Sequence, residues 1–284
     1  MTSVSQFQQD TNVVSFFNCK KDLYFLDVCG YYAHWFSNTY LLEEKYNWKG
    51  VCVEPIPEVF KKLKNNRTAK CYNYALFTES NIPIRFLKHQ LLSGRQPRKT
   101  ITHHVNTHIQ SNKDKNSNKD NEIIVKTLTL QDFIDKYQIP TTIHYLSLDT
   151  MGTELHILKN IDFSKYKFLY LSIENNNDSP KRDELKKLLL DNGYLYKKED
   201  NDRNNYIHES TIVGTYYYKE DYTKPIVIKR ENKTEFTVSC IYWDDEIGTY
   251  DNGFINWKTL GNGKIFYTHI EYGDGNVWHR DMRK

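Results

Sequence analysis

The sequence predicts a doubly wound α/β fold with a mostly parallel sheet, followed by a small C-terminal module that is all β. Short apolar runs alternate with segments of helical spacing, and several runs end at an acid or a turn. Near Val213 this alternation of strand and helix patterns ends, and six of the 12 glycines lie at Gly248 or beyond. We therefore predict two domains, over residues 1–212 and 213–284.

The first part of the chain shows strands and helices in alternation. Apolar runs predict strands at 24–29, 50–53, 70–76 and 82–87, and helical spacing predicts helices at 37–46 and 57–65. Residues 111–121 are almost wholly Ser, Asn, Lys and Asp. Such a composition cannot bury enough apolar area to offset its ordering entropy, so we expect a mobile loop over about 109–122.

The alternation resumes at Ile123. Thr129 can cap a helix that places Phe133 and Ile134 on one face. A second helix begins at Asp178-Ser179-Pro180 and ends at Asn192-Gly193 in the left-handed manner. The remaining apolar runs predict strands at 144–149, 168–174, 194–198 and 205–208, with a short helix at 153–161.

The tail carries hairpin signals and many aromatic residues. Asn252-Gly253, Asn262-Gly263 and Asp274-Gly275 are hairpin dipeptides, and they lie among β-rich runs at 225–228, 236–243 and 264–267. The aromatic residues either fill a small β core or bind a glycan, and the sequence leaves both interpretations open. They are Tyr216, Tyr217, Tyr218, Tyr242, Trp243, Phe254 and Trp257.

Composition argues against several classes of protein. The 39 basic and 36 acidic residues nearly balance, at a net charge of +3, so we expect no nucleic-acid partner. The five cysteines form no C-x-x-C pair, which fits a reducing compartment. Because we find neither a signal peptide nor an apolar run of membrane-spanning length, we expect a cytoplasmic protein with no membrane partner. The composition does not indicate an oligomeric state.

One block carries the strongest chemical signal. Leu146-Ser147-Leu148-Asp149-Thr150 is typical of a buried strand that ends in an acid and turns into a helix. An acid at the carboxyl end of a parallel strand points into the crevice where open α/β sheets bind ligands. Glu54 and Glu174 also follow buried strands. We therefore expect the carboxylates of residues 54, 149 and 174 to gather at one rim of one sheet.

These segments, taken in order, resemble the FkbM-type methyltransferases. The resemblance rests on residues 25–28 with 37–43, on 48–55, on 146–155, and on Ile173-Glu174 with Asn176. It spans about Leu23 to Tyr206 and does not extend to the C-terminal module. It implies a Rossmann-like sheet, S-adenosylmethionine as cofactor, and transfer of a methyl group to a hydroxyl oxygen of a carbohydrate or another small molecule.

The resemblance also implies roles for individual residues. Glu54 would accept both ribose hydroxyls of the cofactor, and Asp149 or Glu174 would take the acceptor's proton. The full cofactor set would be Asp27, Gly30, Asn38, Thr39, Glu54 and Ala75, and the catalytic set Asp149, Glu174 and Asn175. We expect no metal, because His103, His104 and His108 have no acid or cysteine at ligand spacing.

The chain departs from the family pattern at the first turn. Family members usually show Asp-x-Gly-Ala-x-Asp-Gly, whereas this chain has Asp27-Val28-Cys29-Gly30-Tyr31-Tyr32-Ala33. Met151 and Asn175 replace a usual Glu and His. An alternative is therefore an inactive methyltransferase fold that binds a glycan or a protein. A nicotinamide-dependent oxidoreductase is disfavoured, because no G-x-G-x-x-G follows the first strand.

Overall fold

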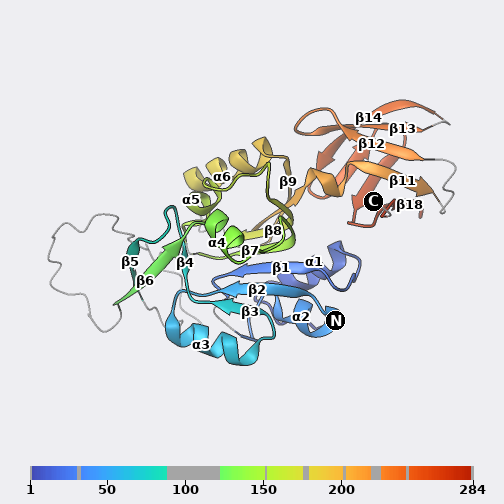
Figure 1. Cartoon of the computed structure of the whole chain (residues 1–284). Helices are drawn as coiled ribbons and strands as arrows, with labels where there is room; N and C mark the ends of the chain where they lie inside the picture. The colour runs from blue at the N-terminus through green and yellow to red at the C-terminus, as the bar shows by residue number, and fades with distance from the viewer. Residues whose placement is uncertain are drawn as a thin grey trace.

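The computed structural model describes residues 2–30, 33–87, 122–150, 152–174, 179–200, 203–218, 225–240 and 243–282. These residues form an α/β domain and a closed antiparallel β-barrel, joined end to end (Figure 1). The α/β class and the mostly parallel sheet that the sequence predicts are confirmed. The domain boundary at residue 212 remains a prediction.

Seven strands make the main sheet, in the order β3-β2-β1-β7-β8-β10-β9. The first five of these are mutually parallel, while β10 runs antiparallel to both β8 and β9. The strands are β1 (Tyr24–Val28), β2 (Lys49–Val53), β3 (Lys70–Tyr72), β7 (Thr142–Leu148), β8 (Lys167–Glu174), β9 (Tyr194–Asp200) and β10 (Arg203–His208).

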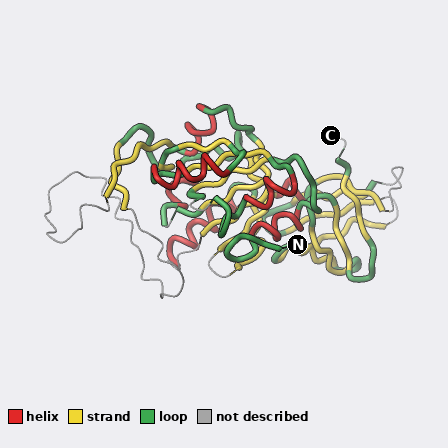
Figure 2. Tube along the Cα trace, turned by 90° about the horizontal axis from the view of Figure 1, so that it is seen from below, coloured by secondary structure: helices red, strands yellow, loops and turns green. Residues whose placement is uncertain are grey.

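Helices cover both faces of this sheet (Figures 1 and 2). Apolar residues of α4, α5 and α6 share one core with Leu26 and Val51, whereas those of α1 and α2 share another with Phe25 and Cys52. The sequence analysis did not predict α1. The bounds are α1 (Gln9–Phe16), α2 (Tyr40–Tyr46), α3 (Pro57–Asn66), α4 (Leu130–Lys136), α5 (Glu154–Leu158) and α6 (Ser179–Asp191).

Local chemistry sets several of these boundaries. The Thr129 hydroxyl accepts a hydrogen bond from the Asp132 amide at 3.0 Å, which confirms the predicted cap of α4. Pro57 is the first residue of α3, where a missing amide proton costs nothing. Gly193, at φ +86°, follows the end of α6 as predicted. The helix predicted at 153–161 is shorter, because it ends at Leu158.

The strand predicted over 70–76 is wrong as one element. It divides into β3 and β4 (Ala75–Leu76), and β4 belongs to a separate sheet with β5 (Pro83–Leu87) and β6 (Glu122–Leu128). The Asn73 amide donates to the backbone carbonyls of Glu54 and Pro55 at 2.7 and 2.9 Å, where the chain leaves the main sheet. The predicted loop over 109–122 lies outside the described residues, except that Glu122 begins β6.

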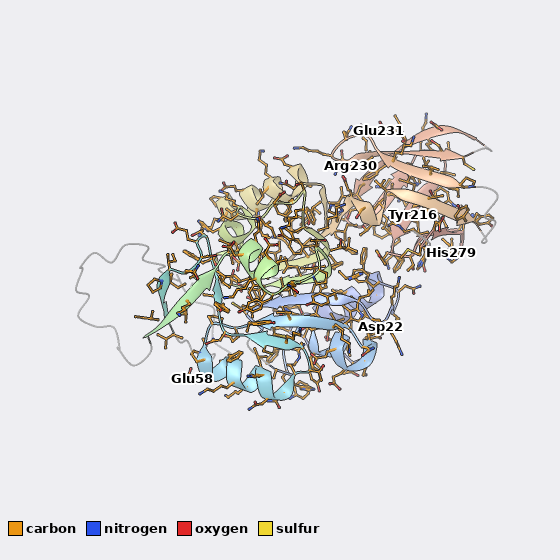
Figure 3. The ribbon with its side chains drawn as sticks, in the orientation of Figure 1. Asp22, Glu58, Tyr216, Arg230, Glu231 and His279 are labelled. Atoms are coloured by element: carbon orange, nitrogen blue, oxygen red, sulfur yellow. The ribbon has the colours of Figure 1, made fainter. Side chains whose placement is uncertain are left out.

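The C-terminal part is an eight-stranded closed barrel, so the prediction of a small β module underestimated it. Each strand pairs with its neighbours in sequence, and β11 closes the barrel against β18. Aromatic residues such as Tyr216, Trp257 and Trp278 fill it, and Tyr216 is labelled in Figure 3. The strands are β11 (Gly214–Tyr218), β12 (Ile226–Arg230), β13 (Glu235–Cys240), β14 (Trp243–Asp251), β15 (Phe254–Trp257), β16 (Gly261–Ile265), β17 (His269–Tyr272) and β18 (Val277–Arg280).

Two predictions for the tail are wrong in detail. The run at 236–243 supplies two strands, β13 and β14, and Asn262-Gly263 lies inside β16 instead of forming a turn. A Cβ on Gly263 would come within 2.6 Å of the Ile270 side chain, so this glycine serves close packing. Asn252-Gly253, with φ of 46° and 91°, does join two strands, as predicted.

The barrel packs against the amino ends of the central strands. The Tyr267 amide donates to the carbonyl of Phe16 at 2.9 Å, and the rings of Tyr267 and Phe17 lie 5.0 Å apart. His144, near the start of β7, lies 6.4 Å from the Tyr267 ring. The connecting 3₁₀ turn η2 (Glu209–Thr211) is bound to the barrel by the Arg230–Glu209 ion pair. The barrel therefore lies at the pole opposite the carboxyl ends of β1, β2 and β7.

Candidate functional site

The carboxyl ends of four parallel strands form an acidic rim. In the strand register, Val53, Val28, Leu148 and Ile173 are successive neighbours across β2, β1, β7 and β8. The next residue on each strand is Glu54, Cys29, Asp149 or Glu174. The three carboxylates that the sequence singled out therefore follow one another along a single rim of the sheet.

Glu54 is the most deeply buried acid of this rim, with 2% of its surface exposed. Its Oε1 accepts a hydrogen bond from the Ile56 amide at 2.8 Å, and no bond is found for Oε2 within the described residues. Burial, reinforced by the charge of Asp27, raises the pKa of Glu54 to about 8. Among the residues that the structure describes, this carboxyl therefore has one oxygen without a hydrogen-bond partner.

Cys29 lies at the centre of the rim in a left-handed conformation, with φ +63°. Burial and then the nearby charges of Glu54, Asp149, Glu154 and Asp27 raise the pKa of its thiol well above the usual range. All four acids are near enough to Cys29 for their charges to act on its thiol. A residue with a Cβ is strained at this φ, which suits glycine.

Glu154 fixes the turn that follows Asp149. Its Oε1 accepts hydrogen bonds from the Thr150 amide at 2.8 Å and the Thr150 hydroxyl at 3.0 Å. Its Oε2 accepts from the Gly152 amide, also at 3.0 Å. Burial raises the pKa of Glu154. The side chain therefore holds the backbone beside Asp149, which is a positioning task that the sequence analysis missed.

A buried ion pair supports the other side of the rim. The Thr39 hydroxyl donates to Asp27 at 2.6 Å and accepts from the Arg67 guanidinium at 2.9 Å. Arg67 also pairs with Glu43 at 2.5 Å. Burial alone would raise the pKa of Glu43, but Arg67 and bonds from Thr68 and Ala69 lower it. Asp27 is thereby connected to a fully paired buried network.

A buried polar row crosses the sheet two residues before the acidic rim. Asp27 is the register neighbour of Ser147, and Ser147 is the register neighbour of Ser172. The Ser172 hydroxyl donates a hydrogen bond to Asn205 Oδ1 at 2.7 Å. The Asn38 amide donates to the Ser147 hydroxyl at 2.9 Å. Asn38 is 7% exposed, and its Oδ1 has no partner within the described residues. A buried, unpaired acceptor is costly unless a ligand satisfies it.

The structure does not gather every residue that the sequence proposed. Ala75 lies in β4, buried against Phe77, Ile84 and Val125, and no described contact joins it to the rim. Gly30 follows Cys29, and a Cβ there would come within 3.1 Å of Asp27. Asn175, Met151, Tyr31, Tyr32 and the three loop histidines lie outside the described residues.

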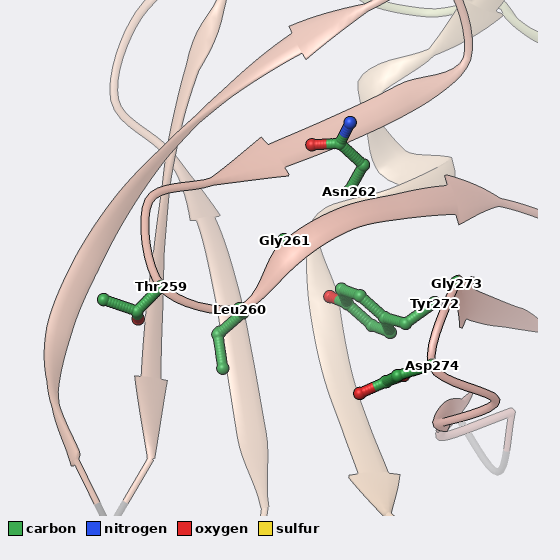
Figure 4. A pocket seen from close by; sticks show the side chains of 7 residues that line it. All are labelled: Thr259, Leu260, Gly261, Asn262, Tyr272, Gly273 and Asp274. Atoms are coloured by element: carbon green, nitrogen blue, oxygen red, sulfur yellow. The ribbon is translucent and has the colours of Figure 1, made fainter.

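The barrel offers a different kind of surface. Its open pocket, of about 440 Å³, is lined by residues of the β15–β16 connection, β16 and the β17–β18 turn (Figure 4). Tyr216 and Trp257 of the aromatic set are buried in the core, whereas Phe254 is 41% exposed. The pocket residues are Thr259, Leu260, Gly261, Asn262, Tyr272, Gly273 and Asp274. Since this lining contains one acid and no buried charge, it resembles a surface depression more than a reaction centre.

Two searches of the described residues gave negative results. No cluster of three or more His, Cys, Asp or Glu side chains there is arranged to hold a metal ion. None of the helices in the described ranges combines the length and hydrophobicity needed to span a bilayer.

A mostly parallel sheet with helices on both faces and acids at its carboxyl rim is a doubly wound α/β fold, and the family match below makes it methyltransferase-like. The model of the methyltransferase FkbM domain matches residues 27–196, which is more than half of the chain. The protein belongs to the FkbM methyltransferase family, whose members generally use S-adenosylmethionine. The match ends before the barrel.

Comparisons with curated proteins and with solved structures do not identify a substrate. No curated protein matches the sequence. Among solved structures, a precorrin-6y C5,15-methyltransferase from Geobacter metallireducens is similar, with 10% identity and a TM-score of 0.38, over 73% of this chain and 90% of that one. A likeness at that level carries no argument about this chain's substrate.

Proposed function

We propose that this protein binds S-adenosylmethionine at the acidic rim and methylates a hydroxyl group of a carbohydrate or another small molecule. The observation that carries the proposal is the strand register, which aligns Glu54, Cys29, Asp149 and Glu174. In open α/β sheets this edge is where ligands bind.

Two unused acceptors fit the cofactor. Glu54 has a free Oε2, and Asn38 has a free Oδ1, within the described residues. A ribose diol donates two hydrogen bonds, and an ammonium group donates up to three. The surrounding acids also favour a ligand that carries sulfonium and ammonium charges. The residues present therefore fit this group.

For methyl transfer, the protein needs mainly to align the acceptor hydroxyl with the methyl group and to remove the hydroxyl proton. When bound, the cofactor supplies a methyl group that is already activated by positive sulfur. Asp149 and Glu174 are only partly buried, so either can face an acceptor and take its hydroxyl proton. Glu154 holds the turn after Asp149, and alignment of this kind supplies much of the rate enhancement in such transfers.

One observation favours the alternative, a fold that binds without methylating. Cys29 places a side chain in the turn where the family usually has glycine, among four carboxylates. If that side chain keeps a cofactor out, the rim serves recognition alone.

The test combines binding with transfer. We expect calorimetry to show S-adenosylmethionine binding to the full chain, and radiolabelled methyl transfer to appear on at least one member of a panel of mono- and oligosaccharides. Asp149→Asn should lower transfer at least tenfold while cofactor affinity is retained, because a base acts on the acceptor. Asp162→Asn, an exposed acid beyond α5, is the matched control.

Absence of cofactor binding by the wild-type chain would contradict the proposal. Binding without transfer to any hydroxyl acceptor would favour the alternative.

A further inference from the structure

Two cysteines lie side by side in the main sheet, and one of them, Cys52, is the register neighbour of Asp27, two residues before Glu54 of the acidic rim. Cys52 of β2 and Cys71 of β3 are direct register neighbours on parallel strands. Adjacent strands are about 4.8 Å apart. A disulfide accepts Cα separations of about 4.4–6.8 Å, so the backbone needs little movement to join these two residues.

The two side chains contact each other and differ in exposure. Cys71 packs against the apolar cluster that contains Cys52, and its thiol donates a hydrogen bond to the Ala69 carbonyl at 3.5 Å. Cys52 is completely buried, whereas Cys71 is partly exposed on the edge strand. A small reagent can therefore reach Cys71 more readily than Cys52.

The surroundings make Cys71 the nucleophile of the pair. The neighbouring Cys52 thiol and then the Arg67 guanidinium lower the pKa of Cys71, against burial and the charges of Glu43 and Asp27, which raise it. The neighbouring Cys71 thiol and burial raise the pKa of Cys52, which keeps its proton. A thiolate beside a cation is the reactive form of cysteine, and a protonated neighbour is suited to resolve its oxidised product.

We propose that Cys71 and Cys52 form a reversible redox pair that peroxides oxidise to an intramolecular disulfide. The Cys71 thiolate attacks one peroxide oxygen, the O–O bond breaks, and hydroxide leaves with the electron pair, which gives a sulfenic acid at Cys71. The Cys52 sulfur then attacks Cys71, the S–O bond breaks, and water leaves with the thiol proton. Two thiols are oxidised, one peroxide is reduced, and two waters form. The proposal does not depend on methyl transfer.

The test uses the wild-type chain, hydrogen peroxide and trypsin. Cleavage after Lys49, Lys61, Lys70 and Arg85 places the two cysteines on separate peptides, 50–61 and 71–85. After brief oxidation and alkylation, a non-reducing digest should contain these peptides joined, about 2 Da lighter than their sum, and dithiothreitol should separate them. Cys240, a partly exposed cysteine of the barrel, is the internal control and should remain alkylable under the same mild treatment.

Single variants separate the two steps. Cys52→Ala should stop the reaction at a Cys71 sulfenic acid that dimedone captures, and Cys71→Ala should leave Cys52 reduced. Far-ultraviolet circular dichroism of each variant confirms folding. The proposal is overturned if wild-type Cys52 stays free while Cys71 is oxidised, or if Cys71 pairs with another cysteine.

Discussion

The two ends of this molecule bury polar groups in opposite ways. At and beside the acidic rim, Glu54, Asp27 and Glu154 are buried together, and within the described residues Glu54 Oε2 and Asn38 Oδ1 have no hydrogen-bond partner. The barrel interior is filled by aromatic and aliphatic side chains, and the acids of its described residues stay outside the buried set. Burying charge costs stability unless it is paired. The rim thus buries carboxyl groups at a cost in stability, which fits the ligand site proposed there, whereas the barrel interior consists mainly of apolar packing.

Removal of the rim acid should have the largest effect. Glu54→Ala should weaken S-adenosylmethionine binding about 100-fold, or about 3 kcal/mol, since it deletes two hydrogen bonds to a charged acceptor. Calorimetric titration measures this. Glu58→Ala, on the exposed side of α3, is the matched control and should bind normally (Figure 3). Equal affinity of both variants would place the cofactor elsewhere.

The pH dependence of binding should follow from the same group. The pKa of Glu54 is about 8 without a ligand, and ribose hydroxyls need the ionised carboxylate, so binding below that pH releases a proton. Affinity should rise about tenfold per pH unit from about pH 5 and level off near 8. Calorimetry in buffers of different ionisation enthalpy counts the proton. In Glu54→Gln this dependence should disappear.

The stability of the ligand-free protein should show the opposite trend. Between the unfolded pKa near 4.5 and the folded value near 8, the folded state holds the Glu54 proton more tightly. This contribution is complete below the lower value and is lost as pH rises through the upper one. Denaturant titrations of wild type and Glu54→Gln across this range isolate it. A wild-type contribution that grows with pH would contradict the assignment.

Overpacking the barrel should cost stability and leave binding intact. A Cβ on Gly248 would lie 2.1 Å from the Trp257 ring, so Gly248→Ala should lower the unfolding free energy by about 1–3 kcal/mol. Gly273→Ala meets no atom within 4 Å and serves as the control. Urea denaturation measures both. If Gly248→Ala also altered cofactor affinity, the two ends would be coupled and the comparison would fail.

Replacing Cys29, the residue with left-handed backbone at the rim, by glycine should have the smallest effect on stability and binding. Cys29→Gly removes a Cβ at φ +63° and should add about 1 kcal/mol of stability. It should also strengthen S-adenosylmethionine binding if the thiol crowds the cofactor. Thermal denaturation with and without ligand separates these contributions. A destabilised variant would mean that the Cys29 contacts outweigh the strain.

The sequence predicted the features that depend on the pattern of apolar residues and on the order of the strands. Apolar runs located β1, β2, β7 and β8, and parallel pairing then required Glu54 and Asp149 to share a rim. Contacts between distant positions were not visible, such as the Arg67–Glu43 pair, whose members are 24 residues apart and look like surface charges in sequence. Glu154 was part of the motif that carried the family resemblance, but its hydrogen bonds to the Thr150 and Gly152 amides were not visible in the sequence. Asn262-Gly263 was wrongly predicted to be a turn. A glycine that is required for close packing inside a strand cannot be distinguished in sequence from a glycine that is required for a turn.

The position of the barrel determines how far it lies from the acidic rim. Its contacts with Phe16 and Phe17 hold it at the far pole, and the intervening strands of five to eight residues span about 20 Å. A short ligand bound to the far side of the barrel would therefore not reach the acidic rim of the same chain. Under the proposed function, a substrate that contacts both the barrel and the rim would have to be an extended polymer, or the contact would have to come from a neighbouring copy.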